Sequence, residues 1–301
     1  MGGNPERGVR RCGRCRWARL DHGVRLATAK ETGGGVDFAL NVRMKIGGLF
    51  FFGVGCLEMV CPADVGIGAK APAGADILFD GTRECLDAKW TYWEGPGFKS
   101  ALPIKWPIVS DPAVNGAMAL MTDDPVAVGG RFGTADIVTK KAYRDFRLHV
   151  EFVVMNPRGN SGVYLQNRYE IQICDGDQTK HGMGAVINET ESPYALYKGL
   201  TKWNSYDIVF RAARFVDGKL VEKPLVTLYF NGVKAHSNQV ISQVWGGPRS
   251  GIDGGNDGGK GITDSPAGLK LQCEGHDVRY RNIWIVEREI VGGNTDFSEK
   301  E

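Results

Sequence analysis

The stretch that most constrains the fold of this chain is 160–173, where apolar and polar residues alternate along two short runs. Successive side chains of a strand point to opposite faces, so one face takes the apolar set: Val163, Leu165, Ile171 and Ile173. The other face takes Tyr164, Gln166, Glu170 and Gln172. This predicts two strands with a buried face and a polar one. The polar face is either solvated, as alternation usually indicates, or a binding surface.

Strand-like patterns continue through the chain after residue 75. Residues 145–154 alternate in the same way, with Arg147, His149 and Glu151 on the polar side, and predict a half-buried strand. Residues 225–230 followed by Asn231-Gly232 predict a hairpin, because both turn residues accept positive φ. Further short strands are expected at 77–79, 117–121, 134–139, 205–212, 268–273 and 278–287. Many short strands with little helix predict an all-β sandwich of two antiparallel sheets.

The composition limits the classes of partner. Lys and Arg total 37 against 35 Asp and Glu, and a net charge of +2 gives no reason to expect a nucleic-acid partner. With 42% hydrophobic residues, the 301-residue chain can bury a core, and we expect one main domain. The sequence has no P-loop, no Gly-x-Ser-x-Gly and no His-Glu-x-x-His, so nucleotide chemistry is not indicated. An oligomeric state is not indicated either.

The first 74 residues differ in character from the rest. We expect 1–43, with an isolated Cys12-x-x-Cys15 pair, to be disordered or to precede a true start at Met44. The apolar run at 46–57 suits a secretory signal and is shorter than the roughly 20 residues of a spanning helix. Small residues at 69–71 suggest a cleavage site after a 44–74 signal and linker. These patterns predict an exported, periplasmic or extracellular protein with a domain at 75–289, a disordered tail at 290–301 and no membrane-spanning segment when mature.

Three cysteines follow the predicted cleavage site: Cys85, Cys174 and Cys273. At most one internal disulfide can form, between Cys174 and Cys273, and unpaired buried thiols are the alternative. The loop at 246–267 is rich in Gly and Asp, and Asp253, Asn256 and Asp257 offer oxygen ligands to a cation such as calcium. Their spacing is not that of an EF-hand, so a flexible surface loop is the simpler interpretation, and no cofactor is predicted.

A second polar face is expected at 268–273. Leu269 and Leu271 fall on its apolar side, Lys270 and Gln272 on its polar side, and Glu274 and His276 follow. If this strand shares a sheet with 160–173, two glutamates face each other, as in enzymes that cleave glycosidic bonds. We therefore predict Glu170, Glu274 and His276 as catalytic residues. Amide, guanidinium and aromatic groups suit sugars, so the predicted binding residues are Tyr164, Gln166, Gln172, Trp203, Asn204, Arg211, Lys270 and Gln272.

Six segments together resemble one known family, the 3-keto-disaccharide hydrolase domain. They are LFDGT at 78–82 and the stretches 134–152, 160–173, 202–215, 226–233 and 269–285, and the resemblance spans about 77–288. It implies a jelly-roll sandwich of the concanavalin A-like lectin and glucanase type, with sugar bound on a concave face, in exported bacterial proteins. Many members carry a different turn where this chain has Cys273-Glu274-Gly275-His276, so the acid or base at this turn is left open.

The substrate that the resemblance implies, a 3-keto glycoside, favours elimination because the ketone acidifies the proton on C2. We expect Glu170 or His276 to remove this proton, and Gln172, Gln272 or Arg211 to stabilise the enolate. Glu274 or His276 would protonate the leaving oxygen before water adds back. The alternatives are a non-catalytic carbohydrate-binding module and, less favoured, a protein-interaction domain.

Overall fold

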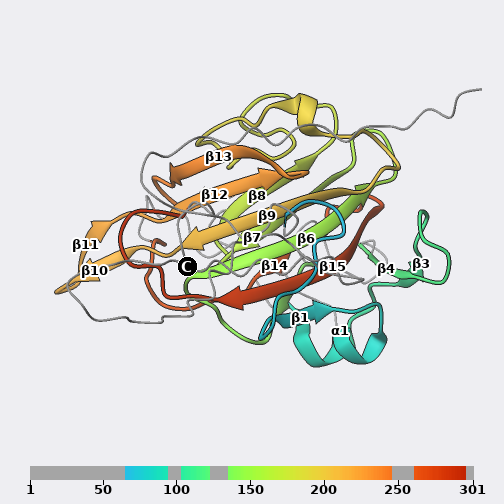
Figure 1. The fold of residues 1–301 in the computed structure, drawn as a ribbon, viewed down its shortest axis with the longest axis horizontal. Coiled ribbons are helices and arrows are strands. Elements are labelled where there is room, and N and C mark those ends of the chain that lie inside the picture. The colour runs from blue at the N-terminus through green and yellow to red at the C-terminus, as the bar shows by residue number, and fades with distance from the viewer. Residues whose placement is uncertain (1–64, 94–102, 123–134, 246–260, 296–301) are drawn as a thin grey trace, which may run out of the picture. The chain divides into compact units, whose positions relative to one another are not determined.

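The computed structural model of the chain describes residues 65–93, 103–122, 135–245 and 261–295, which lie in the unit Cys61–Glu301. The expectations for the Cys12-x-x-Cys15 pair, the Met44 start, the apolar run at 46–57 and the cation ligands at 253–257 lie outside these residues. Within the described parts, antiparallel strands form two stacked sheets (Figure 1). This arrangement confirms the predicted all-β jelly-roll sandwich.

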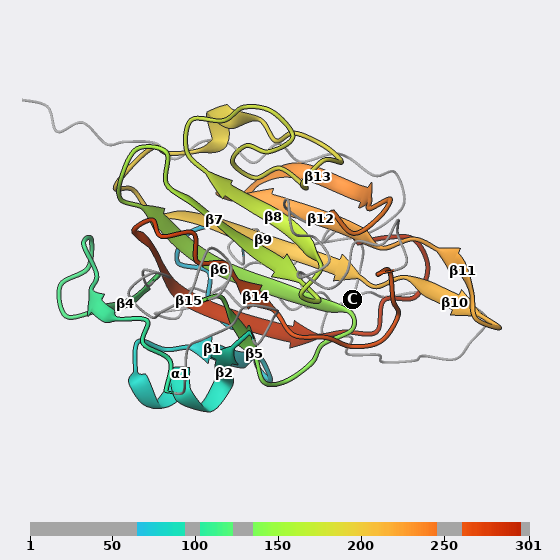
Figure 2. The same ribbon diagram turned by 180° about the vertical axis from the view of Figure 1, so that it is seen from behind.

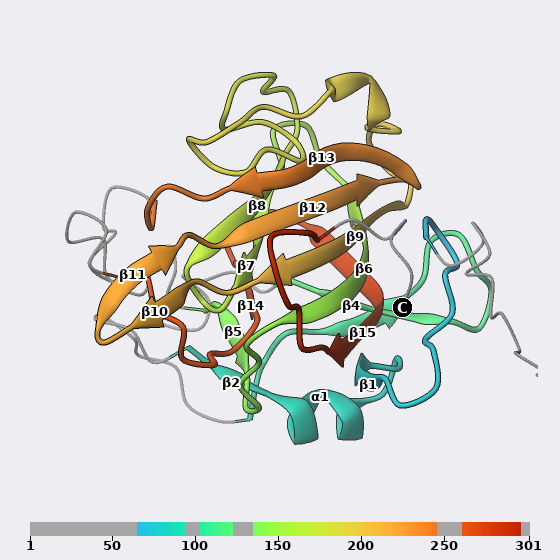
Figure 3. The same cartoon turned by 60° about the vertical axis from the view of Figure 1, so that its left-hand side comes forward.

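The larger sheet has eight strands among the residues described, in the order β13-β12-β9-β6-β15-β4-β3, with β1 also paired to β15. Their bounds are β1 (Asp76–Phe79), β3 (Ile108–Ser110), β4 (Met118–Met121), β6 (Phe146–Val154), β9 (Asn204–Arg211), β12 (Leu225–Phe230), β13 (Val233–Val240) and β15 (Val278–Glu287). This sheet faces the reader in Figure 1 and is seen at another angle in Figure 3. The predicted strands at 77–79, 145–154, 205–212 and 278–287 all belong to it.

The smaller sheet carries the polar strands singled out in the sequence, in the order β2-β5-β14-β7-β8. Their bounds are β2 (Trp90–Tyr92), β5 (Ile137–Thr139), β14 (Lys270–Leu271), β7 (Asn160–Leu165) and β8 (Tyr169–Cys174). Figure 2 turns this sheet toward the reader. Because β14 pairs with both β5 and β7, the segments 268–273 and 160–173 lie side by side in one sheet, which is the condition that the sequence had left open.

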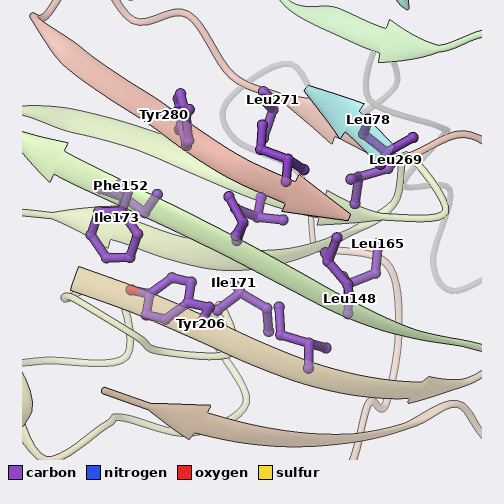
Figure 4. Packing of buried hydrophobic residues seen from close by; sticks show 14 of the residues in the cluster. Leu78, Leu148, Phe152, Leu165, Ile171, Ile173, Tyr206, Leu269, Leu271 and Tyr280 are labelled. Atoms are coloured by element: carbon purple, nitrogen blue, oxygen red, sulfur yellow. The ribbon is translucent and has the colours of Figure 1, made fainter. Parts of the chain in front are cut away.

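The core lies between the two sheets (Figure 4). From the smaller sheet it receives Leu165, Ile171, Ile173, Leu269 and Leu271, and from the larger sheet Leu148, Phe152, Tyr206 and Tyr280. Every one of these side chains is almost completely removed from solvent. The side chains predicted to face the core are therefore confirmed as core residues on both sheets.

Three local elements complete the fold. The predicted turn at Asn231-Gly232 joins β12 to β13 with φ of 52° and 80°, which confirms the hairpin and its turn chemistry. Helix α1 (Arg83–Lys89) begins after Thr82, whose hydroxyl accepts a hydrogen bond from the Cys85 backbone N–H. A short hairpin of β10 (Arg214–Val216) and β11 (Lys219–Glu222) projects from one end, and a 3-10 turn spans Tyr194–Leu196.

The outer face of the larger sheet is covered by residues 65–69, here called the N-terminal strap. All nine residues of β6 are buried, although the sequence predicted a half-buried strand. The strap contributes to this burial at Glu151, whereas Val153 packs with Ala119 and Trp203. At the other end of the domain, the Thr295 hydroxyl lies 2.8 Å from that of Thr227 on β12. The folded domain thus includes residues on both sides of the predicted limits at 75 and 289.

Candidate functional site

The outer face of the smaller sheet brings most of the predicted site residues together. Tyr164 on β7 pairs with Glu170 on β8 and with Lys270 on β14, so these three side chains form one row across three strands. In the next row Gly162 pairs with Gln172, and on its other side its carbonyl accepts a 3.0 Å hydrogen bond from the Gln272 backbone N–H. Strand pairing therefore sets the six residues in two adjacent rows on the face away from the core.

Glu170 lies low on this face, with 7% of its surface exposed. An ideal Cβ placed on Gly162 would overlap Oε1 of Glu170 and would lie 3.0 Å from its Cδ and 3.1 Å from its Cγ. The carboxyl group of Glu170 thus extends sideways from β8 over the backbone of β7. There it lies in the row of Gln172 and Gln272.

Glu274 joins the same surface through Gln272. The Gln272 side-chain amide donates to Glu274 Oε1 at 2.7 Å and to the Tyr164 hydroxyl at 3.2 Å. The pKa of the Cys174 thiol, at the end of β8, is raised to about 11, first by burial and then by nearby carboxylates that include Glu170 and Glu274. The structure places the predicted carboxylate pair on one face.

Lys270 is fully buried beneath this surface, which corrects its prediction as a residue that contacts substrate. Its ammonium lies 3.0 Å from Asp136 Oδ2 and is covered by two aromatic rings, with 3.8 Å to the Tyr164 ring centroid and 4.7 Å to that of Trp93. A buried ammonium needs such compensation because desolvation of a charge is costly. Lys270 therefore supports the Tyr164 ring from below.

Sequence reasoning missed two members of this support, Asp136 and Trp93. Asp136 directly precedes β5, and its second carboxylate oxygen accepts a 2.7 Å hydrogen bond from the Cys273 backbone N–H. Trp93 directly follows β2. The sequence pattern could have indicated both residues. Asp136 is next to the buried Ile137 and Trp93 is next to the buried Tyr92, so alternation places both side chains on the outer face.

Gln166 does not belong to the outer face, because β7 ends at Leu165. Gln166 and Asn167 adopt positive φ of 49° and 53° in the turn to β8, so the alternation stops before it reaches them. The Gln166 amide nitrogen lies 3.2 Å from the Ser265 carbonyl oxygen and 3.3 Å from that of Arg144. We conclude that Gln166 holds two loops together and that its prediction as a binding residue is wrong.

Three further predicted binding residues lie on or beside the larger sheet, away from Glu170. Trp203 donates from Nε1 to Asp111 Oδ1 at 3.0 Å, and Asn204 at the start of β9 accepts at 3.0 Å from the Lys198 backbone N–H. Arg211, at the end of β9, is ion-paired with Glu222 and bonds the Gly292 carbonyl at 2.6 Å. Each of the three side chains thus bonds a structural partner, and only Nε of Arg211 is without one in the described residues, which corrects the expectation that they line the sugar site.

His276 lies in the loop between β14 and β15, two residues after Glu274. Its backbone carbonyl accepts hydrogen bonds from the Thr122 hydroxyl and from the Val278 backbone N–H. Its Nδ1 is buried and has no hydrogen-bond partner in the described parts of the chain. The loop is therefore fixed at its backbone.

The disulfide considered for Cys174 and Cys273 is not formed. Neither residue takes part in a disulfide, and nor does Cys85. Cys273 is fully buried in the core, whereas Cys174 follows the core residue Ile173 and points to the outer face. Unpaired thiols, the alternative drawn from the sequence, are what the structure shows. Over the described ranges, no group of three His, Cys, Asp or Glu side chains could hold a metal ion.

A second charged cluster lies under the N-terminal strap on the larger sheet. His149 Nδ1 is 2.7 Å from Asp207 Oδ1, its Nε2 is 3.4 Å from Glu151 Oε1, and Arg281 bonds Glu151 Oε2 at 2.7 Å. Burial opposes protonation of His149, but the hydrogen bonds to the two carboxylates outweigh it and raise its pKa. Burial also opposes ionisation of Glu151, but its hydrogen bonds lower the pKa to about 2. His149, Glu151 and Asp207 are almost completely buried, and Arg281 is partly exposed.

Comparison with known proteins agrees with this fold. The sequence profile of the 3-keto-alpha-glucoside-1,2-lyase-like domain matches residues 74–286. A solved structure from Parabacteroides distasonis ATCC 8503, provisionally assigned as a glycosyl hydrolase, is 24% identical with a TM-score of 0.56 and covers 72% of this chain and 85% of its own. A second structure with the same description is 18% identical with a TM-score of 0.47 and covers 72% and 94%. No curated protein matches the chain significantly. No helix in the described residues is long and apolar enough to cross a membrane.

Proposed function

Because this chain belongs to the 3-keto-alpha-glucoside-1,2-lyase-like family of carbohydrate-active enzymes, we propose that it cleaves the glycosidic bond of 3-keto glycosides or 3-keto-disaccharides. The observation that carries the proposal is the outer face of the smaller sheet. There Glu170 extends over Gly162, and Gln272 links Glu274 to Tyr164. Two carboxylates with amides beside them provide a base, an acid and hydrogen-bond donors on one surface.

The ketone at C3 sets the order of the chemical steps. It withdraws electrons, which disfavours an oxocarbenium-like transition state at C1 and makes the C2 proton more acidic. Glu170 removes this proton, and the electron pair moves toward the C3 oxygen as an enolate. The side-chain amide of Gln172 is the proposed donor to that oxygen, and the amide of Gln272 could take this role only by giving up its hydrogen bond to Glu274 or to Tyr164.

Elimination then breaks the bond between C1 and the leaving oxygen. The enolate electrons form the C1–C2 double bond, and Glu274 donates a proton to the departing oxygen, with His276 as the alternative acid. Water adds its oxygen to C1 and a proton returns to C2, so the net reaction is hydrolysis. Arg211, considered as an enolate donor from the sequence, is excluded from this role because it lies on the larger sheet with structural partners.

Substrate selectivity tests the proposed activity. Purified protein is incubated with 3-oxo-glucosides and, in parallel, with their unoxidised parents, and release of aglycone is measured. We expect release from the oxidised set alone, since only these have an acidified C2 proton. Equal release from both sets would contradict the 3-keto specificity, and no release from either would favour the alternative of a carbohydrate-binding module.

Isotope incorporation tests the proposed route. When turnover takes place in deuterium oxide, the proton that returns to C2 comes from solvent, so the product should carry deuterium at C2. Complete absence of deuterium there would favour direct displacement at C1 by a carboxylate pair.

We also propose export of the protein, on the basis of the apolar run at 46–57. N-terminal sequencing of secreted protein tests this. A mature chain that retains Arg10 or Arg16 would contradict a true start at Met44, and absence of the protein from the secreted fraction would contradict export.

A further inference from the structure

Gly162 occupies an unusual position for a glycine. It lies in the interior of β7, paired with Gln172 on one side and bonded to Gln272 on the other. A glycine inside a strand is destabilising, because it gives up more chain freedom on folding than other residues and contributes no side chain to packing. Such a glycine usually has a local reason.

The backbone does not supply this reason. The φ of Gly162 is not in the left-handed region, so any residue could adopt its conformation. The three heavy atoms nearest to an ideal Cβ at this position are Oε1, Cδ and Cγ, all from Glu170. At Gly182, by comparison, the nearest atoms are backbone atoms of Asp177 and Gln178. The closest conflict for a side chain at 162 is therefore with the Glu170 side chain.

We propose that Gly162 is a positioning residue for the lyase reaction, since its missing side chain leaves the space in which the Glu170 carboxylate lies. This inference rests on the proposed function of Glu170 as the base. With a side chain at 162, the carboxylate would be turned away from the row of Gln172 and Gln272. The base would then be separated from the amides that receive the enolate.

The first test is the kinetics of Gly162→Ala with a 3-oxo-glucoside. The atom that an added Cβ would overlap most is Oε1, at the far end of the flexible Glu170 side chain, so we expect a folded protein. A displacement of the base on the scale of 1 Å is expected to lower kcat by about 100-fold. KM should change little, because the groups that hold the sugar remain. Gly293→Ala is the matched control, since an added Cβ there meets nothing within 4 Å.

A double-mutant cycle separates this proposal from the proposed function. If Gly162 acts only through Glu170, then Gly162→Ala has no further effect on kcat once Glu170 is replaced by Gln. Wild-type kcat in Gly162→Ala together with an inactive Glu170→Gln would overturn the positioning role and leave the base assignment intact. Full activity in Glu170→Gln would overturn the base assignment itself.

A stability measurement covers the case in which Gly162→Ala does not fold. In a chain that carries Glu170→Ala, the space above residue 162 is vacant, and adding Gly162→Ala should keep or raise the melting temperature. A lower melting temperature in the double variant than in Glu170→Ala alone would show that another group needs this glycine, and would overturn the proposal.

Discussion

Removal of the N-terminal strap should destabilise the domain strongly. The Gly66 N–H donates to Asp207 Oδ2 at 2.7 Å, and the Gly68 N–H donates to Glu151 Oε1 at 2.7 Å. Both carboxylates are almost completely buried beneath the strap, so its removal exposes them and replaces these two hydrogen bonds by hydrogen bonds to water. A hydrogen bond to a charged group contributes about 1.5–3 kcal/mol, and two of them give about 3–6 kcal/mol.

This loss is large compared with the about 5–15 kcal/mol that stabilises a typical domain. Urea unfolding of residues 65–301 and 72–301, followed by circular dichroism, measures it as a lower midpoint for the shorter chain. Lys70→Ala in the longer chain is the control, because this side chain is exposed. Equal free energies of unfolding for the two chains would refute the role given to the strap.

The strap also limits where a signal peptide can be cleaved without loss of stability. A cut near residues 69–71, as the small residues there suggest, would remove both strap donors. If the protein is exported, we expect its mature chain to begin before Val65, and mass spectrometry of the secreted protein measures this directly.

Three further predictions concern the buried charged residues. Because the pKa of Glu151 is lowered to about 2, its contribution to stability is complete above its usual value of 4.5 and is lost as pH falls toward 2; Glu151→Gln should flatten this part of an acid-unfolding curve. The raised pKa of His149 acts in the opposite sense, so its contribution is complete below 6.5 and is lost as pH rises through the raised value, which melting curves of His149→Gln test. Lys270→Met leaves Asp136 buried without its cation and should cost about 3–5 kcal/mol in urea unfolding, whereas a loss below 1 kcal/mol would contradict the buried pair.

The sequence predicted those parts of the fold that depend on local periodicity. The hairpin at 225–233 and the strand at 278–287 were predicted closely, because alternation and turn preference depend only on residues that are adjacent in the sequence. Helix α1 was not predicted, since seven residues are too few to show a helical period. The polar side of β6 was expected to face solvent, and what contributes to its burial at Glu151 is a segment about 80 residues away in the chain.

The candidate site was predicted where it depends on strands that pair. Glu170, Gln172, Gln272 and Glu274 share a face because β8, β7 and β14 are neighbours. Arg211 was misplaced because side-chain chemistry suited to sugars does not reveal which sheet a strand joins. Gln166 was misplaced because the pattern gave no sign of where β7 ends. The burial of Lys270 could not be predicted, since its partner Asp136 is 134 residues away.

The central claim is that the reaction takes place on the outer face of the smaller sheet with Glu170 as the base. The most direct test is kcat for aglycone release from a 3-oxo-glucoside by Glu170→Gln and by Trp203→Phe, a control on the larger sheet. Loss of general-base catalysis predicts a fall of about 10²–10⁴-fold for Glu170→Gln and an unchanged rate for Trp203→Phe. An unchanged rate in Glu170→Gln, with folding confirmed by its melting curve, would contradict the account.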